Sequence, residues 1–201
     1  MMIDQTKLSV LITKYNDDFV KNIPGEIYKW EAVKCFQDNW DTNAKDFADM
    51  LSKSLAKTGN LLASTNNFPR RMIEIFASLY TNDIKSLFET LFDETQELTH
   101  RINNFKIGID FVLKKWNPNG GKSHYQTDNV ISTYLWLRFP DKYYIYKPSI
   151  AQAVFSELGI GIKLRGKGAE AIEQTYQLYD EIANELSKDE DYLRLLSNAL
   201  N

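Results

Sequence analysis

The sequence is poor in the residues that break helices or cross-link a chain. Its 201 residues include nine glycines, five prolines and one cysteine. The lone Cys35 cannot form a disulfide within the chain, and its helical setting beside Phe36 favours a small core residue. So few glycines and prolines, in a chain that is 43% hydrophobic, argue against a turn-rich β-sandwich and favour helices packed around a core.

Long apolar runs are also absent. The N-terminus has no basic segment followed by a continuous apolar core, which a secretory signal peptide requires. No run approaches the length of about 18 to 20 apolar residues that a membrane span needs. We therefore expect no membrane partner and a reduced, cytoplasmic location.

One glycine-rich segment, Gly-Gly-Lys-Ser at 120–123, resembles part of a phosphate-binding loop but lacks the rest of it. A Walker A motif needs a glycine where this chain has Trp116, and it follows a strand where this sequence predicts a helix. Nucleotide hydrolysis is therefore not expected. Lys122, Ser123 and the backbone N–H groups can still contact a phosphate, and an ordinary exposed turn is the alternative.

Other catalytic and metal-binding patterns are missing as well. His100 and His124 are the only histidines, and neither has the cysteine cluster or histidine spacing of a metal site. His100 falls on a predicted solvated helix face, whereas His124 lies in a basic loop where a phosphate or base contact is an alternative. No nucleophile elbow, Cys–His signature, dinucleotide fingerprint or distinctive carboxylate pair occurs. We expect no enzyme, no cofactor and no metal.

Hydrophobic residues recur at helical spacing along most of the chain. The segment 22–26, which contains Pro24, is expected to break the first helix, and Gly59 to stop the third in a left-handed conformation. Pro69 and Pro148 suit first turns of helices. The predicted helices cover 6–22, 29–40, 43–58, 69–79, 84–92, 94–116, 128–139, 148–158, 169–187 and 189–199.

These elements predict a mainly α, multi-helix globular domain. Residues 128–139 have the β-branched and aromatic content of a strand as well, but Asp128 as a cap and the stop at Pro140 favour a helix. A short extended segment or small hairpin is expected near 143–147 and 160–165. We expect one domain over 1–201. Two alternatives concern its ends: residues 1–24 form an appended helix, and residues 168–201 form a helical pair packed on the domain.

Charge is unevenly distributed. Residues 101–167 carry eleven Lys or Arg and four Asp or Glu, a net charge of +7, while the rest of the chain carries −10. A basic middle in an acidic protein can attract a polyanion locally. The alternative is that the flanking helices are simply rich in acids.

Residues 133–149 concentrate aromatic and basic side chains. Aromatic faces beside Arg or Lys are what unpaired bases stack on. Rings at helical or alternating spacing are more often core packing, and both interpretations stay open. The segment contains six rings and three cations: Tyr134, Trp136, Phe139, Tyr143, Tyr144 and Tyr146, with Arg138, Lys142 and Lys147 between them.

Four sequence blocks together resemble a known family. They are YKWEAVKCFQDNW (28–40), FADMLSKSLAKTGNLLAS (47–64), FPRRMIEIFA (68–77) and HYQTDNVISTYLWLRFPDKYYIYK (124–147). In order and character they resemble the N-terminal region ahead of the motor in McrB-type restriction proteins, which are AAA+ GTPases of modification-dependent restriction systems. The resemblance spans about residues 28–160. It implies a helical, non-motor module that recognises DNA or regulates the motor, and the absent Walker and nuclease motifs exclude carrying over motor activity.

Our leading hypothesis is a non-catalytic recognition module of an McrB-like restriction system that binds DNA, with an unknown base modification, beside an AAA+ motor or nuclease subunit. The alternative is a protein-interaction or regulatory domain that docks such a subunit through its acidic helices without touching nucleic acid. For the DNA hypothesis, the candidate phosphate contacts are Lys122, His124, Arg138, Lys142 and Lys147, and the candidate stacking rings are Trp136, Tyr143 and Tyr144.

Overall fold

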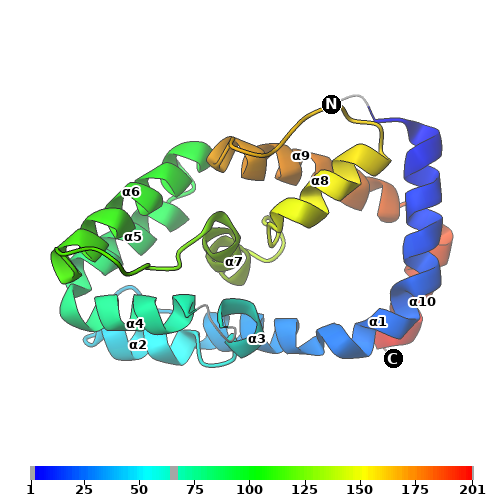
Figure 1. The fold of residues 1–201 in the computed structure, drawn as a ribbon. Coiled ribbons are helices and arrows are strands. Elements are labelled where there is room, and N and C mark those ends of the chain that lie inside the picture. The colour runs from blue at the N-terminus through cyan, green and yellow to red at the C-terminus, as the bar shows by residue number, and fades with distance from the viewer. Residues whose placement is uncertain (1–2, 64–67, 201) are drawn as a thin grey trace. The chain divides into compact units, whose positions relative to one another are not determined.

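The computed structural model describes residues 3–63 and 68–200. Every regular element in that part of the chain is a helix, which confirms the mainly α prediction (Figure 1). The helices are α1 (Gln5–Asn39), α2 (Phe47–Ser54), α3 (Gly59–Leu62), α4 (Pro69–Leu79), α5 (Thr81–Phe92), α6 (Leu98–Trp116), α7 (Asp128–Arg138), α8 (Pro148–Glu157), α9 (Ala169–Leu186) and α10 (Glu190–Leu200).

The chain divides into two compact units. Unit 1 combines residues 1–27 with 146–201, and unit 2 is the continuous segment 28–145. The two end segments that were considered as additions to a single domain, 1–24 and 168–201, thus fall in the same unit. Unit 2 has fifteen Lys or Arg and fourteen Asp or Glu, a net charge of +1, whereas unit 1 has nine and thirteen, a net charge of −4.

Helix α1 runs without interruption through the segment that was expected to end it. The predicted break at 22–26 is wrong, because the helix continues from Gln5 to Asn39. A proline inside a helix removes one backbone hydrogen bond and crowds the preceding turn, but the bonds on either side can hold the helix together. The boundary between the two units falls shortly after this point, between Ile27 and Tyr28.

The core of unit 2 is built from aromatic rings around α5. The Phe88 ring lies 5.4 Å from that of Trp40, 5.4 Å from Phe105 and 5.1 Å from Tyr134, measured between centroids. Helix α5 packs against α4 and α6 along its length and also contacts α2 and α7. Edge-to-face rings at this spacing bury large apolar areas in favourable geometry, so they join helices that are distant in sequence.

Helix α7 confirms the helical interpretation of 128–139. Every residue from Val130 to Leu137 is buried, and within unit 2 the helix contacts α3 and α5. The chain leaves the helix at Phe139, just before Pro140. Residues 143–147 and 160–164 form neither helix nor strand in the described part of the chain, so the hairpin considered there is not present among these residues.

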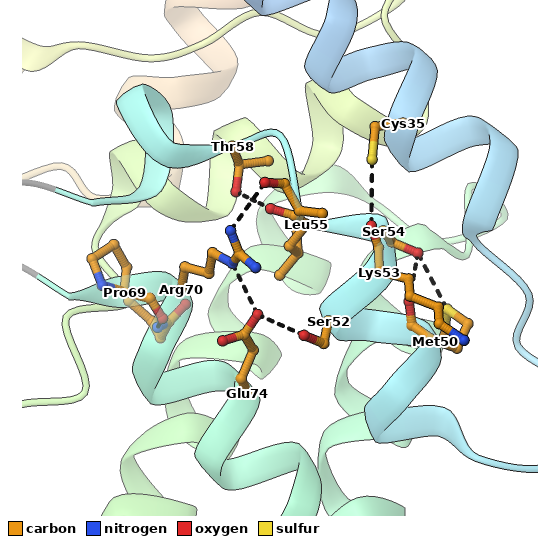
Figure 2. Close-up of polar contacts among 12 residues, drawn as sticks. Cys35, Met50, Ser52, Lys53, Ser54, Leu55, Thr58, Pro69, Arg70 and Glu74 are labelled. Atoms are coloured by element: carbon orange, nitrogen blue, oxygen red, sulfur yellow. Dashed lines mark hydrogen bonds and ion pairs between the residues drawn. The ribbon is translucent and has the colours of Figure 1, made fainter.

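The start of α4 is held against α2 by a small polar cluster, shown in Figure 2. Arg70 Nε lies 2.9 Å from Glu74 Oε1, and the same guanidinium donates to the Ala56 carbonyl at 3.1 Å. Ser52 of α2 donates to the same Glu74 oxygen at 3.1 Å. Pro69 occupies the first turn, as predicted. These contacts fix the orientation of the first turn of α4, which carries part of the site described below.

Gly59 and Gly159 differ in their backbone conformation. Gly59 was expected to end a helix in the left-handed conformation, but it is the first residue of α3 and its φ is not positive. Gly159 does follow the end of α8 with φ +72°, a conformation that glycine adopts without steric strain.

In unit 1, α10 packs on the first part of α1. The Tyr192 ring lies 5.4 Å from Phe19 and 6.1 Å from Tyr15, between centroids. Asn16 donates to Asp189 Oδ1 at 2.9 Å, and this aspartate also accepts from the Tyr192 backbone N–H. The hydrogen bonds therefore fix where α10 begins. Across residues 3–63 and 68–200, no helix is both long and apolar enough to cross a membrane.

Candidate functional site

Two of the three predicted stacking rings are buried. Trp136 is 8% exposed and Tyr143 is 4% exposed. The Trp136 ring lies 6.0 Å from that of Trp30, and the Tyr143 ring lies 5.8 Å from that of Phe139. Neither offers a face to a base, so their assignment as stacking residues is wrong. Tyr144 is half-buried and already takes part in contacts of its own.

The Tyr143 hydroxyl belongs to a buried polar network. Arg101 donates to this hydroxyl at 2.6 Å and to the Leu91 carbonyl at 3.0 Å, and Tyr143 donates to Glu94 Oε1 at 2.9 Å. Arg101 is only 3% exposed, so it is not one of the surface cations that the charge count suggested. Burial raises the pKa of Tyr143, and its hydrogen bond to Glu94 acts in the same direction. The network anchors the chain after α7 to the start of α6.

Carboxylates neutralise several cations of the basic middle region. Lys142, a predicted phosphate contact, is paired with Glu94, and this hydrogen bond raises its pKa. Lys106 lies 2.6 Å from Asp128, and Lys115 lies 2.8 Å from Asp83 of α5. Of the remaining predicted contacts, Lys147 lies in unit 1 and the others lie in unit 2. Carboxylates therefore offset part of the net charge of +7 that the sequence shows in this region.

His124 holds the loop between α6 and α7 in shape. Its Nδ1 accepts from the Gln126 backbone N–H at 2.8 Å, and its Nε2 lies 3.1 Å from Asp110 Oδ1. Since a backbone N–H can only donate, Nδ1 is the acceptor and Nε2 carries the proton that is donated to Asp110. With both nitrogens engaged, the imidazole acts as a support for the loop rather than as a phosphate contact.

The same loop and α4 enclose a groove of about 660 Å³. We call it the basic aromatic groove. Three rings come from different segments, and two cations stand beside them; Met72 and Ile75 complete the walls. The lining residues are Phe68, Arg71, Met72, Ile75, Trp116, Gly121, Lys122, Ser123 and Tyr125. Of the residues considered from the sequence for phosphate contact, the groove contains Lys122 and Ser123.

The rings are set by the packing beneath them. Trp116 lies edge-on to the core residue Phe76, with 5.8 Å between centroids. Phe68, 41% exposed, meets Tyr125 edge-on at 6.2 Å. The Lys122 ammonium lies 5.0 Å from the centroid of the Trp116 ring, within the range of a cation–π interaction. The groove thus presents aromatic faces that are fixed in position, one of them covered by a lysine.

The loop has an unusual backbone. Tyr125 has φ 57°, and it is the non-glycine residue with positive φ in the described part of the chain. Such a conformation is rare for a bulky residue and is often found at ligand sites. Ser123 Oγ accepts from the Tyr125 N–H at 3.1 Å. The preceding glycines, Gly120 and Gly121, have φ of +74° and +79°, which they adopt without strain.

Gln126, 2% exposed, locks this conformation from below. Its amide nitrogen donates to the Pro69 carbonyl at 2.8 Å and to the His124 carbonyl at 2.9 Å. Its amide oxygen accepts from the Tyr134 hydroxyl at 2.8 Å. Burial raises the pKa of Tyr134, which keeps that hydroxyl protonated as a donor. One glutamine therefore connects the loop, the start of α4 and the core helix α7.

The charge of the groove is entirely positive. Both Arg71 and Lys122 are exposed, and neither forms an ion pair with a described residue. No carboxylate lines the groove among the described residues. In a unit with almost equal numbers of positive and negative side chains, this local excess of positive charge is complementary to an anionic group.

A second aromatic site in unit 2 has the opposite charge. We call it the acidic aromatic pocket; it has a volume of about 390 Å³. Arg138, a predicted phosphate contact, lies here beside three carboxylates, with its guanidinium 5.1 Å from the centroid of the Phe139 ring. Negative charge in this pocket opposes the binding of a phosphate. It is lined by Trp40, Asp41, Thr42, Glu89, Phe92, Asp93 and Arg138.

Sequence reasoning missed most of the basic aromatic groove. Phe68 and Arg71 lie near the start of one predicted helix, and Trp116 lies at the end of another; nothing in their spacing connects them. The only signals were the gap between the predicted helices 94–116 and 128–139 and the short segment of glycines and Lys122 within it. Tyr125 lies there too, but a positive φ is not visible in a sequence.

No protein-family model, curated protein or solved structure matches this chain. Within the described residues, no cluster of three or more His, Cys, Asp or Glu side chains is arranged to hold a metal ion. The chemistry of the groove therefore has to be inferred from its own rings, cations and backbone.

Proposed function

We propose that unit 2 is a non-catalytic DNA-binding module and that the basic aromatic groove is its contact surface. The observation that carries this proposal is the pair of cations, Arg71 and Lys122, which lack carboxylate partners among the described residues and stand beside three aromatic rings. Nucleic acids offer the complementary groups, because phosphates attract the cations and base faces match the rings.

The local nature of the charge suits such a role. Unit 2 as a whole carries a net charge of only +1, so long-range attraction for any polyanion is weak. Binding then depends on the groove, where cations act at short range and beside apolar walls. The sequence resemblance to McrB-type proteins is consistent with such a module working beside an AAA+ motor or a nuclease subunit, and this context stays a prediction.

Fluorescence anisotropy of a labelled oligonucleotide tests the proposal. At about 50 mM salt, where phosphate contacts are strongest, the protein is expected to bind, and Lys122→Gln and Arg71→Gln are each expected to weaken binding about tenfold, in line with the loss of one charge-assisted contact. Lys45→Gln is the matched control, since Lys45 is exposed, outside the groove and without an ion pair to a described residue. If no DNA binds at this salt concentration, or if all three variants behave alike, the proposal is wrong.

A second function, association with a second copy of the chain, is favoured by the outer face of α6. Ile107 and Phe111 lie one turn apart and are 69% and 57% exposed, and exposed apolar residues that adjoin each other can mark an interface. Ile107→Glu is the test. Sedimentation velocity over a range of concentrations would show association of the wild type that this variant lacks. If the wild type stays monomeric at every concentration, and if the wild type and Ile107→Glu bind DNA equally well, this support is lost.

A further inference from the structure

We propose, resting on the proposed function, that the basic aromatic groove binds an unpaired nucleotide of a single DNA strand. The base lies against the rings of Trp116, Phe68 and Tyr125, and its phosphate meets Lys122, Arg71 and the loop at 120–123. This assignment names the form of nucleic acid that the groove takes, which charge alone does not specify.

The position of the rings favours an unpaired base. In a duplex, the faces of the bases are covered by their neighbours, so a protein ring cannot stack on them. A single strand exposes those faces, and fixed aromatic side chains beside a basic track are the common means of binding it. A volume of about 660 Å³ lies within the usual range of about 300–1,000 Å³ for small-ligand pockets, which is enough for a nucleotide but not for a duplex.

Lys122 is placed to exchange one interaction for another. In this structure its ammonium lies 5.0 Å from the centre of the Trp116 ring, where a stacked base would lie. An incoming base displaces the ammonium from the ring. The released lysine then pairs with the phosphate of the same nucleotide, so a cation–π contact is replaced by base stacking and a charge-assisted contact.

The loop also supplies donors for a phosphate. The backbone N–H groups of Gly121, Lys122 and Ser123 make no hydrogen bond to any described residue. The Ser123 hydroxyl accepts from Tyr125 N–H, and its own proton is not donated within the described chain. Successive N–H groups beside residues of positive φ form the concave arrangement that binds anions. The groove therefore has an aromatic wall for the base and a donor-rich edge for the phosphate.

Three ligands of about ten nucleotides, within the range of single-strand binding sites, separate stacking from charge. They are a single strand, a duplex of the same sequence, and an abasic strand that keeps the phosphates but has no bases. Anisotropy titration is expected to show the single strand binding at least about tenfold more tightly than the other two, which corresponds to about 1.4 kcal/mol.

Two variants each remove one ring of the groove and replace it with a residue that suits the local backbone conformation. Tyr125→Gly suits a positive φ better than tyrosine does, and Phe68→Ser places a preferred capping residue before α4. Each is expected to reduce the preference for the single strand over the abasic strand at least about threefold. Phe111→Ala removes an exposed ring outside the groove and should leave that preference unchanged.

The outcomes distinguish this inference from the function on which it rests. If the single strand and the abasic strand bind equally, or if the duplex binds most tightly, the nucleotide assignment is wrong while DNA binding stands. If none of the three ligands binds at about 50 mM salt, the proposed function itself fails. A loss of preference in both groove variants, with unfolding midpoints at or above the wild-type value, supports the assignment.

Discussion

Unit 2 contains two sites that share aromatic walls and differ in charge. The basic aromatic groove has Arg71 and Lys122 and no carboxylate among its described lining residues, whereas the acidic aromatic pocket has three carboxylates around Arg138. Each is open to solvent and large enough for a small group. Rings alone therefore do not identify a ligand site for nucleic acid; what separates the two is whether the neighbouring cations are already balanced by acids.

The two sites also differ in how their backbone is held. The groove depends on a loop with positive φ at Tyr125, fixed by the hydrogen bonds of Gln126. The acidic pocket adjoins the turn after α5, where Asp93 accepts from the side chains of Thr95 and Gln96 at 2.6 and 2.7 Å. In the pocket, that carboxylate is thus engaged in stabilising the turn. In the groove, Arg71 and Lys122 form no ion pair with a described residue, and Lys122 lies over the Trp116 ring.

The largest expected effect on DNA binding comes from reversing the charge of the basic aromatic groove while leaving the acidic aromatic pocket unchanged. The double variant Arg71→Glu with Lys122→Glu should weaken DNA binding by at least about 100-fold, since two charge-assisted contacts of about 1.5–3 kcal/mol each are replaced by repulsion. Arg138→Glu, in the acidic pocket, should change it less than about threefold. Anisotropy at low salt measures both, and an equal loss in the two variants would show that the sites do not differ in function.

The next effect concerns Arg101, which interacts electrostatically with Asp93 and Glu94 from a buried position. Arg101→Met leaves the Leu91 carbonyl and the Tyr143 hydroxyl without their donor, so we expect the free energy of unfolding to fall by about 2–4 kcal/mol. Urea denaturation followed by circular dichroism measures the change. DNA affinity of the folded variant should stay the same. A loss below about 1 kcal/mol would mean that this network is not needed for the fold.

A smaller loss is expected when the support of the groove is removed. Gln126→Leu breaks the bonds to the Pro69 and His124 carbonyls and leaves the buried Tyr134 hydroxyl unpaired, at a cost of about 1–3 kcal/mol in unfolding free energy. Because the loop then loses its shape, DNA binding should weaken as well. Gln177→Ala, at an exposed position of α9, is the control. Unchanged binding in a destabilised Gln126→Leu would show that the loop conformation does not matter for the ligand.

The smallest effect is a dependence of stability on acid, to which Asp93 and Glu94 after α5 contribute. Partial burial acts to raise the pKa of Glu94, but hydrogen bonds from Lys142 and Tyr143 lower it overall. Hydrogen bonds also lower the pKa of Asp93. A carboxylate with a lowered pKa in the folded state stabilises the fold above its ordinary pKa of about 4, and this contribution is lost as the pH falls through the lowered value.

Urea unfolding between neutral pH and about pH 3 should therefore show stability decreasing on the acid side. Glu94→Gln should remove part of this dependence, by less than about 1 kcal/mol because solvent screens exposed charges. Glu89→Gln removes a carboxylate that lines the acidic aromatic pocket, and it serves as the control. An identical acid response in wild type and Glu94→Gln would contradict this account.

The helices could be predicted because their causes are local. The apolar stripe of α5, with Ile84, Phe88 and Leu91 buried, and the prolines that begin α4 and α8 can be read within a few turns of chain. The failure at 22–26 is informative, since Pro24 was treated as a stop where neighbouring turns continue the helix. A local signal predicts a boundary only when nothing beyond it favours continuation.

The candidate site could be predicted only in part. Lys122, predicted as a phosphate contact, lies in the groove, and glycines beside a lysine in a loop favour its exposure; its contact with a phosphate stays a prediction. Trp136 and Tyr143 were chosen as stacking rings, yet they are core residues, and aromatic residues look the same in a sequence whether they are buried or exposed. Phe68 and Trp116 were not considered, because only packing brings the end of α6 beside the start of α4.

The sequence by itself determined a mainly helical chain, the first residues of several helices and a surplus of cations in its middle. Periodicity, capping and formal charge depend on residues that are close together along the chain. Only the tertiary structure decided which cations are paired, because their partners are distant: Lys142 meets Glu94, 48 residues away, while within residues 3–63 and 68–200 Lys122 meets the Trp116 ring and no carboxylate. Charge becomes a binding site where folding leaves it unpaired, and that depends on contacts between segments that sequence order does not specify.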